Sequence, residues 1–153
     1  MKLYQLLKYS IAIAVVSITL CSPLQAKHYP DFVTEANCLA TNIYFEARGE
    51  SVKGQLAVAL VTLNRVADSS FPDSICDVVH EGKSKGKCQF SWYCDRKSDK
   101  IPLNSKEAKL ALAIAIAVMT TPIEDITSGA LYFHSRAHKQ TENVIKIGNH
   151  VFY

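Results

Sequence analysis

The segment NIYFEARGE places Glu46, Arg48 and Glu50 within five positions of one another. Glu46 follows Ile43 by three residues and Leu39 by seven, so on a helix it would lie on the apolar side. Partial burial there, together with the negative end of the helix dipole, would raise the pKa of the carboxyl group. A carboxyl group that stays protonated near neutral pH can serve as a general acid. The segment therefore predicts acid catalysis by Glu46.

A structural role is the alternative for Glu46. An ion pair with Arg48, two residues further on, would lower the pKa of the carboxyl group and favour a purely structural side chain. The sequence leaves open whether this pair forms. Glu50 lies beyond the expected helix end, where an acidic side chain is more typical of a cap or a loop anchor.

Two helices must hold this segment in place. From Phe32 to Ala47, apolar residues recur at steps of three and four, which predicts a helix with one apolar stripe. Gly49 is typical of a helix end. The sequence from Val52 to Ala67 is apolar on most sides, which predicts a second, buried helix.

The remaining sequence predicts one further helix and a small sheet. The stretch from residue 69 to about residue 102 is expected to be rich in loops. Asn104 and Glu107 resemble a capping box, and KEAKLALAIAIAVMTT, apolar almost all round, is predicted to be the central core helix. ALYFH has strand composition, and VIKIGNHVFY predicts two strands joined at Gly148 and Asn149. The predicted fold class is α+β, mainly α, with a small antiparallel β element.

Residues 1–26 have the three parts of a secretory signal peptide: a basic start, the apolar run YSIAIAVVSITL and the exit CSPLQA. Cleavage is expected after Ala26. An uncleaved anchor is the alternative, although the apolar run is shorter than the roughly 20 residues of a membrane span. Cys21 would suggest a lipid anchor, but Leu20 stands where a lipoprotein signal has a small residue. We therefore expect one exported domain, residues 27–153, in the periplasm or outside the cell, without stable membrane insertion.

Charge and cysteine content agree with export. Cleavage after residue 26 removes two of the 17 basic residues and none of the 14 acidic ones, which lowers the net charge from +3 to +1. That balance gives no indication of a nucleic-acid partner. Four cysteines remain, and an even number in an exported chain predicts two disulfides. Their pairing is open. Cys88 and Cys94 are separated by five residues, which is more than the two to four residues of a usual zinc-binding Cys pair. The cysteines are Cys38, Cys76, Cys88 and Cys94.

Six motifs occur in order between about Cys38 and Tyr153: IYFEARGE, GQLAVALVTLNRV, FPDSICDVV, CQFSW, GALYFH and GNHVFY. Together they resemble the catalytic domain of the SleB/CwlJ family of cell-wall lytic enzymes. The resemblance implies a lysozyme-like fold and cleavage of peptidoglycan between N-acetylmuramic acid and N-acetylglucosamine. The family's essential glutamate is the first of its EARGE motif, which falls on Glu46. Peptidoglycan strands are then the expected partner, no metal or other cofactor is needed, and we expect a monomer.

A cleft for glycan strands needs flat surfaces for sugar faces and neutral hydrogen-bonding groups for hydroxyl and acetamido groups. CQFSWYC supplies both, although Phe90 and Trp92 could instead pack inward in a core loop braced by disulfides. In ALYFH, Tyr132 and His134 share one strand face by alternation. The candidate substrate-binding residues are Gln89, Ser91, Trp92, Tyr132 and His134.

A single-acid mechanism is predicted because no second acid stands out. Most glycosidases use two carboxylates, and Glu81, Asp95 and Asp99 are interpreted as solvated loop charges. Glu46 would protonate the glycosidic oxygen and then, as a carboxylate, accept the proton of the C6 hydroxyl of muramic acid. Closure of a 1,6-anhydro ring makes this a lytic transglycosylase. A hydrolytic muramidase with a second carboxylate is the alternative.

Two further functional classes are alternatives to a glycan-cleaving enzyme. A zinc amidase or peptidase could use His134, His138 and His150. The strand composition of ALYFH argues against it, since a strand does not present the first two histidines as an H-x-x-x-H helix does. A wall-binding module without catalysis is the other class, and the intact EARGE motif argues against it.

Overall fold

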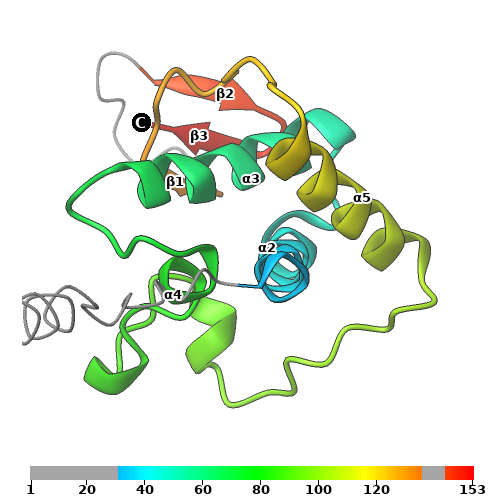
Figure 1. The fold of residues 1–153 in the computed structure, drawn as a ribbon, viewed down its shortest axis with the longest axis vertical. Coiled ribbons are helices and arrows are strands. Elements are labelled where there is room, and N and C mark those ends of the chain that lie inside the picture. Colours follow the sequence, from blue (N-terminus) through cyan, green and yellow to red (C-terminus); the bar gives the residue numbers. More distant parts are fainter. Residues whose placement is uncertain (1–30, 136–143) are drawn as a thin grey trace, which may run out of the picture.

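The computed structural model describes residues 31–135 and 144–153, so the expected signal segment lies outside the described residues. In the described part, α2 (Phe32–Ala47), α3 (Val52–Ala67) and α5 (Lys106–Thr120) are the long helices. Figure 1 shows α2 between α5 and the short helix α4, with a small sheet behind α3. α2 contacts α3, α4 and α5. The predicted α+β class, mainly α, is confirmed.

The ends of α2 and α3 agree with the sequence prediction. Asp31 caps α2 by accepting a hydrogen bond from the backbone N–H of Thr34 (3.2 Å), and Ser51 caps α3 through the N–H of Gly54 (3.3 Å). Side-chain capping of this kind satisfies N–H groups that have no partner within the helix. The two helices are joined by a short connection that carries Glu50.

The prediction for α5 was wrong in two respects. Its cap is Ser105 rather than Asn104, because the Ser105 hydroxyl accepts from the N–H of Ala108 (3.1 Å). α5 is also not the central helix: Leu112 and Ile116 on its outer face are 37% and 40% exposed. Its buried positions are mostly alanines, whose small side chains let α5 pack closely against α2. None of the helices within the described ranges is long and apolar enough to span a bilayer.

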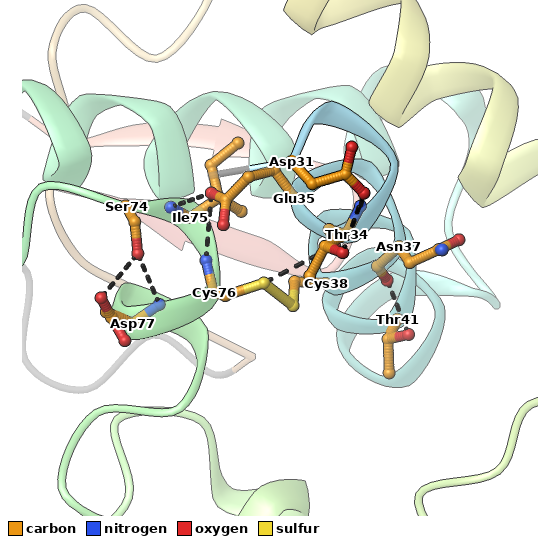
Figure 2. The surroundings of a disulfide bond; sticks show 10 residues. All are labelled: Asp31, Thr34, Glu35, Asn37, Cys38, Thr41, Ser74, Ile75, Cys76 and Asp77. Carbon is orange, nitrogen blue, oxygen red and sulfur yellow. Dashed lines mark hydrogen bonds between the residues drawn. A yellow bond between two sulfur atoms is a disulfide. The ribbon is translucent and has the colours of Figure 1, made fainter. Parts of the chain in front are cut away.

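The loop-rich region contains a helix that the sequence did not predict, α4 (Ile75–Val79). At five residues, α4 is too short to show a helical period. Its first N–H groups, those of Ile75 and Cys76, donate to the buried carboxylate of Glu35 at 2.6 and 3.3 Å (Figure 2). Negative charge at a helix N-terminus is stabilising, so Glu35 docks α4 onto α2.

The two expected disulfides are present, and the structure gives their pairing. Cys38 is bonded to Cys76, which links α2 to α4 (Figure 2), and Cys88 is bonded to Cys94. Their sequence separations are 38 and 6 residues. The second bond closes a small loop that contains a turn of 3-10 helix, η2 (Ser91–Cys94). Another such turn, η1, covers Lys83–Lys85.

The sheet has the strand order β1-β3-β2 and is antiparallel, with strands β1 (Phe133–His134), β2 (Ile145–Ile147) and β3 (His150–Phe152). The predicted hairpin turn is confirmed. Gly148 has a φ of +60°, and a Cβ at this position would collide with the carboxylate of Glu50. That carboxylate accepts from the backbone N–H and the side-chain amide of Asn149 (3.1 and 2.8 Å). Glu50 is therefore a loop anchor, as its position suggested.

α3 takes part in both hydrophobic clusters of the described residues. The larger cluster lies between the four α-helices and η2 and includes Leu39, Ile43, Val78 and Trp92. The smaller one joins Ala57 and Val61 of α3 to the sheet. Residues near the C-terminal end of α3 consequently lie between the helical part and the sheet, where they can connect side chains from both.

Candidate active site

Glu46 lies in the last turn of α2 and is partly buried. Burial raises the pKa of Glu46 from its ordinary value of 4.5 to about 6, although the positive charge of Arg65 lowers it. The predicted direction is confirmed, with burial as the main cause. The guanidinium of Arg48 instead lies over the ring of Tyr44, 5.0 Å from the centroid. The cation that acts on Glu46 is therefore Arg65.

Arg65 is a buried arginine near the C-terminal end of α3, with 4% of its surface exposed. Its Nε donates to the carbonyl oxygen of Leu131 at 2.7 Å. The guanidinium carbon lies 5.0, 5.4 and 5.7 Å from the ring centroids of Phe90, Phe71 and Tyr132. Rings at this distance attract a cation, most strongly where water is excluded. Arg65 thus connects α3 to the segment that carries Tyr132.

Asn64, the residue before Arg65, holds the same segment. Its side-chain amide donates to a carboxylate oxygen of Asp125 (3.0 Å) and to the carbonyl oxygen of Ala130 (3.1 Å). Asp125 in turn accepts from the N–H groups of Thr127 and Gly129. The turn before β1 is therefore fixed to α3 by side-chain hydrogen bonds, which positions the residues that follow it.

Tyr132 and His134 come together with Tyr153 at the sheet. Tyr132 is 45% exposed and its ring stacks on that of Tyr153, with centroids 5.8 Å apart. The ring of His134 lies 5.6 Å from the same tyrosine ring. Phe133 instead packs toward Phe90 and Phe152, so the predicted alternation of faces is observed. The guanidinium of Arg65 also lies over the ring of Tyr132, 5.7 Å from its centroid.

The three candidates in CQFSWYC differ in exposure. Gln89 and Ser91 are exposed. Trp92 is only 7% exposed, stacks on Phe45 with ring centroids 4.8 Å apart, and donates its indole N–H to the side-chain oxygen of Asn42 (3.1 Å). A tryptophan with its ring packed and its N–H satisfied is a core residue. The structure favours the inward-packing interpretation for Trp92 and leaves Gln89 and Ser91 available to a ligand.

Of the three acids interpreted as solvated loop charges, Glu81 does not fit that description. Asp95 and Asp99 are exposed, and Asp95 lies 3.7 Å from the ammonium group of Lys97. Glu81 has a carboxylate oxygen, Oε2, that is shielded from solvent. The loop after α4 folds back, with the N–H of Gln89 donating to the carbonyl oxygen of Glu81 (3.1 Å). This closure covers a side chain that composition alone assigned to the surface.

The histidines weighed as zinc ligands lie partly outside the described residues. His138 is one of those outside. His150 is buried in the sheet against Phe133, with ring centroids 5.2 Å apart. In the part of the chain that the structure describes, no group of three His, Cys, Asp or Glu side chains could hold a metal ion.

The family described as Cell Wall Hydrolase matches residues 49–153 of this sequence, more than half of its length. The chain belongs to the cell wall hydrolase family. The matched segment begins three residues after Glu46, so the role of Glu46 rests on its geometry and on the motif resemblance.

This cell wall hydrolase is 32% identical over 120 residues to a spore cortex-lytic enzyme of Bacillus cereus. The alignment covers 74% of the chain but 42% of that relative. Two solved structures are similar: the catalytic domain of the germination-specific lytic transglycosylase SleB from Bacillus anthracis and that of the Bacillus cereus SleB protein. Their identities are 28% and 29% and their TM-scores 0.51 and 0.52. The two alignments cover 82% and 81% of this chain. They cover 97% and 93% of the chains in the two solved structures. The lysozyme-like fold is confirmed.

Sequence reasoning missed Arg65 in this cell wall hydrolase, although a signal was present. Arg65 follows Val61 by four residues and Val58 by seven, and both valines are completely buried. A cation in register with the buried face of a helix needs an anion or aromatic rings nearby. The same argument that selected Glu46 on the first helix would have selected Arg65 on the second.

Proposed function

We propose that this cell wall hydrolase cleaves peptidoglycan glycan strands between N-acetylmuramic acid and N-acetylglucosamine, with Glu46 as the catalytic acid. The observation that carries the proposal is the partly buried carboxyl group of Glu46, whose pKa is about 6. A group with this pKa is protonated in a useful fraction of molecules near neutral pH. The name of the Bacillus anthracis relative, a lytic transglycosylase, supports the same reaction class.

The proposed reaction uses Glu46 twice. Glu46 donates its proton to the glycosidic oxygen as the bond between that oxygen and C1 of muramic acid breaks. The acetamido group of the sugar stabilises the cationic centre at C1. The carboxylate then accepts the proton of the C6 hydroxyl while O6 bonds to C1 and closes the 1,6-anhydro ring. Glu46 ends protonated, and neither water nor a cofactor is consumed.

The opposing effects of burial and Arg65 suit both halves of this cycle. Burial alone would make Glu46 a poor proton donor and a poorly stable carboxylate. Arg65 favours the charged form that exists between the two proton transfers. A pKa near the working pH is the best compromise for a group that must give and then take a proton. Arg65 therefore serves the proposed mechanism without touching the substrate.

We propose Gln89, Ser91, Tyr132 and His134 as substrate contacts, because they are at least partly exposed. Neutral amide, hydroxyl and aromatic groups are the chemistry that binds sugars. Trp92 is left out of this set, since its ring is packed on Phe45. We further propose that residues 1–26 direct export and that the protein acts as a monomer in the periplasm or outside the cell. Its two disulfides favour an oxidising compartment.

The product of digestion tests the proposed reaction. Purified peptidoglycan treated with the enzyme is expected to release muropeptides that end in 1,6-anhydro-muramic acid. Mass spectrometry identifies them as one water lighter than the hydrolytic products. Borohydride gives a second readout, since two hydrogens add to a free reducing end and none to an anhydro end.

A hydrolytic muramidase would give a different outcome. Reducing ends as the dominant product, together with loss of activity when one further Asp or Glu is replaced, would contradict the transglycosylase assignment and leave Glu46 as the acid. Cleavage of the stem peptide that stops on addition of a chelator would instead indicate the zinc amidase or peptidase.

A further inference from the structure

The segment from residue 83 to residue 100 concentrates the positive charge of the expected exported domain. It carries six basic and two acidic residues, whereas the rest of residues 27–153 carries nine basic and twelve acidic ones. A pocket of about 340 Å³ in this segment is lined mostly by charged side chains, with one tyrosine and one disulfide cysteine: Lys83, Arg96, Lys97, Asp99, Tyr93 and Cys94. The proposed cleavage of a glycosidic bond by Glu46 makes no use of these cations.

Two of the three cations in this pocket are available to an anionic ligand. The ammonium group of Lys97 lies 3.7 Å from the carboxylate of Asp95, which partly neutralises it. Lys83 and Arg96 are exposed, and neither forms an ion pair within residues 31–135 and 144–153. Asp95 also accepts a hydrogen bond from the backbone N–H of Lys97 (2.8 Å), in a turn where Arg96 has a φ of +63°. The pocket therefore offers two positive charges without a carboxylate partner.

Tyr93 forms the wall between this cationic pocket and a second pocket. Its ring stacks on that of His80, with centroids 4.3 Å apart. The ammonium group of Lys83 lies 4.3 Å from the centroid of the same ring and donates to the hydroxyl of Tyr93 (3.2 Å). A ring that contacts both a cation and a second ring has a preferred orientation. Tyr93 is thereby held in place, and it holds the ammonium group of Lys83 at the edge of the pocket.

The second pocket, of about 260 Å³, lies against α2 and offers neutral polar groups. Thr34, Asn37 and Thr41 line it from successive turns of α2 (Figure 2). His80 lines it as well. Burial lowers the pKa of His80, so this side chain is uncharged near neutral pH. Hydroxyl, amide and neutral imidazole groups are suited to hydrogen bonds with the amide groups of a peptide.

Tyr93 and Asp99 line both pockets, and we name the two pockets together the Tyr93 site. Tyr93 belongs to η2, as does Ser91, a proposed sugar contact. Their Cα atoms are at most about 7.6 Å apart, because consecutive Cα atoms lie about 3.8 Å apart. A peptide of five residues attached to a sugar beside Ser91 would span up to about 17 Å. The Tyr93 site is therefore within reach of a peptide carried by the bound glycan.

We propose that the Tyr93 site binds the stem peptide of peptidoglycan, the short peptide attached to muramic acid. The proposal rests on the proposed function, because it assumes that the enzyme binds this polymer. Stem peptides carry free carboxylates, which match Lys83 and Arg96, and an amino group on their diamino residue, which matches Asp99. The sugars themselves carry no charge for these residues. The enzyme should consequently prefer glycan strands that carry peptides.

Lys83→Gln/Arg96→Gln is the direct test. On soluble glycan strands with their stem peptides, we expect KM to rise about fivefold with kcat unchanged, the scale of two lost ion pairs at an exposed site. On the same strands freed of peptides by an amidase, the variant and the wild type should have equal KM values. Lys83→Arg/Arg96→Lys keeps both charges and should keep the KM of the wild type. Lys106→Gln/Lys109→Gln removes two exposed charges from α5 and is the matched control.

Binding without turnover gives a second readout on the wild type. The N-acetylated tetrapeptide alanyl-γ-glutamyl-diaminopimelyl-alanine should displace the backbone amide signals of Tyr93 and Arg96 in an NMR titration. Its binding should weaken as added salt screens the charges. Inorganic phosphate is the control anion and should bind more weakly than the tetrapeptide.

Three results would overturn the proposal. The first is that Lys83→Gln/Arg96→Gln changes KM equally on strands with and without peptides, or on neither. The second is that the tetrapeptide leaves the signals of Tyr93 and Arg96 in place, a result that stands even if this variant fails to fold. The third is equal affinity for phosphate and the tetrapeptide, which would indicate a general anion-binding surface.

These outcomes are distinguishable from a failure of the proposed function. The tetrapeptide has no glycosidic bond, so its binding does not depend on cleavage. If Glu46 is not the acid, Glu46→Gln keeps its activity while the tetrapeptide still binds at the Tyr93 site. If only the inference is wrong, Glu46→Gln is inactive and the tetrapeptide does not bind there.

Discussion

Glu46→Gln is expected to lower the rate of glycan cleavage at least about a hundredfold, the scale of a lost general acid. The amide keeps the shape of the side chain in the last turn of α2 but has no proton to transfer. Release of soluble muropeptides from purified peptidoglycan measures the rate. The folded structure should be retained, since the side chain keeps its volume in a partly buried position.

Glu50→Gln is the matched control for this experiment. Glu50 lies four residues further on and anchors the hairpin turn through Asn149. Removing its charge should weaken these hydrogen bonds and cost stability, while catalysis at low temperature is largely retained. Equal activity of Glu46→Gln and the wild type would remove the central claim. Equal losses in the two variants would show that the loss comes from the fold and not from the chemistry.

Glu46→Gln should be more stable than the wild type in a pH window that is set by the pKa of Glu46. The folded protein holds this proton up to about pH 6 and the unfolded chain only to 4.5, so the wild type loses stability as the pH rises through that range. Above it, the buried charge costs up to about 2 kcal/mol. Glu46→Gln avoids this cost and should be more stable above pH 6 by up to that amount. The difference should vanish below pH 4.5.

Helix ends and the choice of Glu46 were predictable because local signals decide them. Asp31 and Ser51 cap α2 and α3 in the structure, and the apolar periods start directly after them. Glu46 could be selected because Leu39 and Ile43, in register with it, are completely buried. The hairpin turn was predictable for the same reason, since Gly148 supplies the positive φ that the turn requires.

The partners of Glu46 were not predictable from local patterns. Arg48 is its neighbour in sequence, but the helix directs the guanidinium to the ring of Tyr44. Arg65 acts on Glu46 because α3 packs against α2, and it contacts the ring of Phe90 because the loop after α4 folds back. Each depends on contacts between segments far apart in sequence. The disulfide pairing has the same origin, because Cys76 meets Cys38 when α4 docks on α2.

Removing the disulfide between Cys38 and Cys76 is expected to cost about 4 kcal/mol of the free energy of unfolding. The bond closes a loop with a sequence separation of 38 residues, and a long loop restricts the unfolded chain more than a short one. The change corresponds to about a thousandfold in the unfolding equilibrium. Denaturant titration of Cys38→Ser/Cys76→Ser against the wild type measures it.

The second disulfide gives the matched control. Cys88 and Cys94 are separated by 6 residues, so Cys88→Ser/Cys94→Ser should cost only about 2 kcal/mol. A larger loss for this pair than for the first would contradict the loop-length argument. It would indicate that the loop with Gln89 and Ser91 depends on its bond in the folded state.

Activity distinguishes an effect on the unfolded chain from an effect on the site. Without the bond, α4 is still held by the carboxylate of Glu35, which accepts from the N–H groups of Ile75 and Cys76. The loop that carries Gln89 and Ser91 follows α4 in the chain. Folded Cys38→Ser/Cys76→Ser should therefore cleave peptidoglycan within about twofold of the wild type at low temperature, because the bond acts mainly on the unfolded chain. A folded variant with a large loss of activity, and with the pKa of Glu46 displaced, would contradict this. It would mean that the covalent link, rather than Glu35, holds α4 and the loop after it in place.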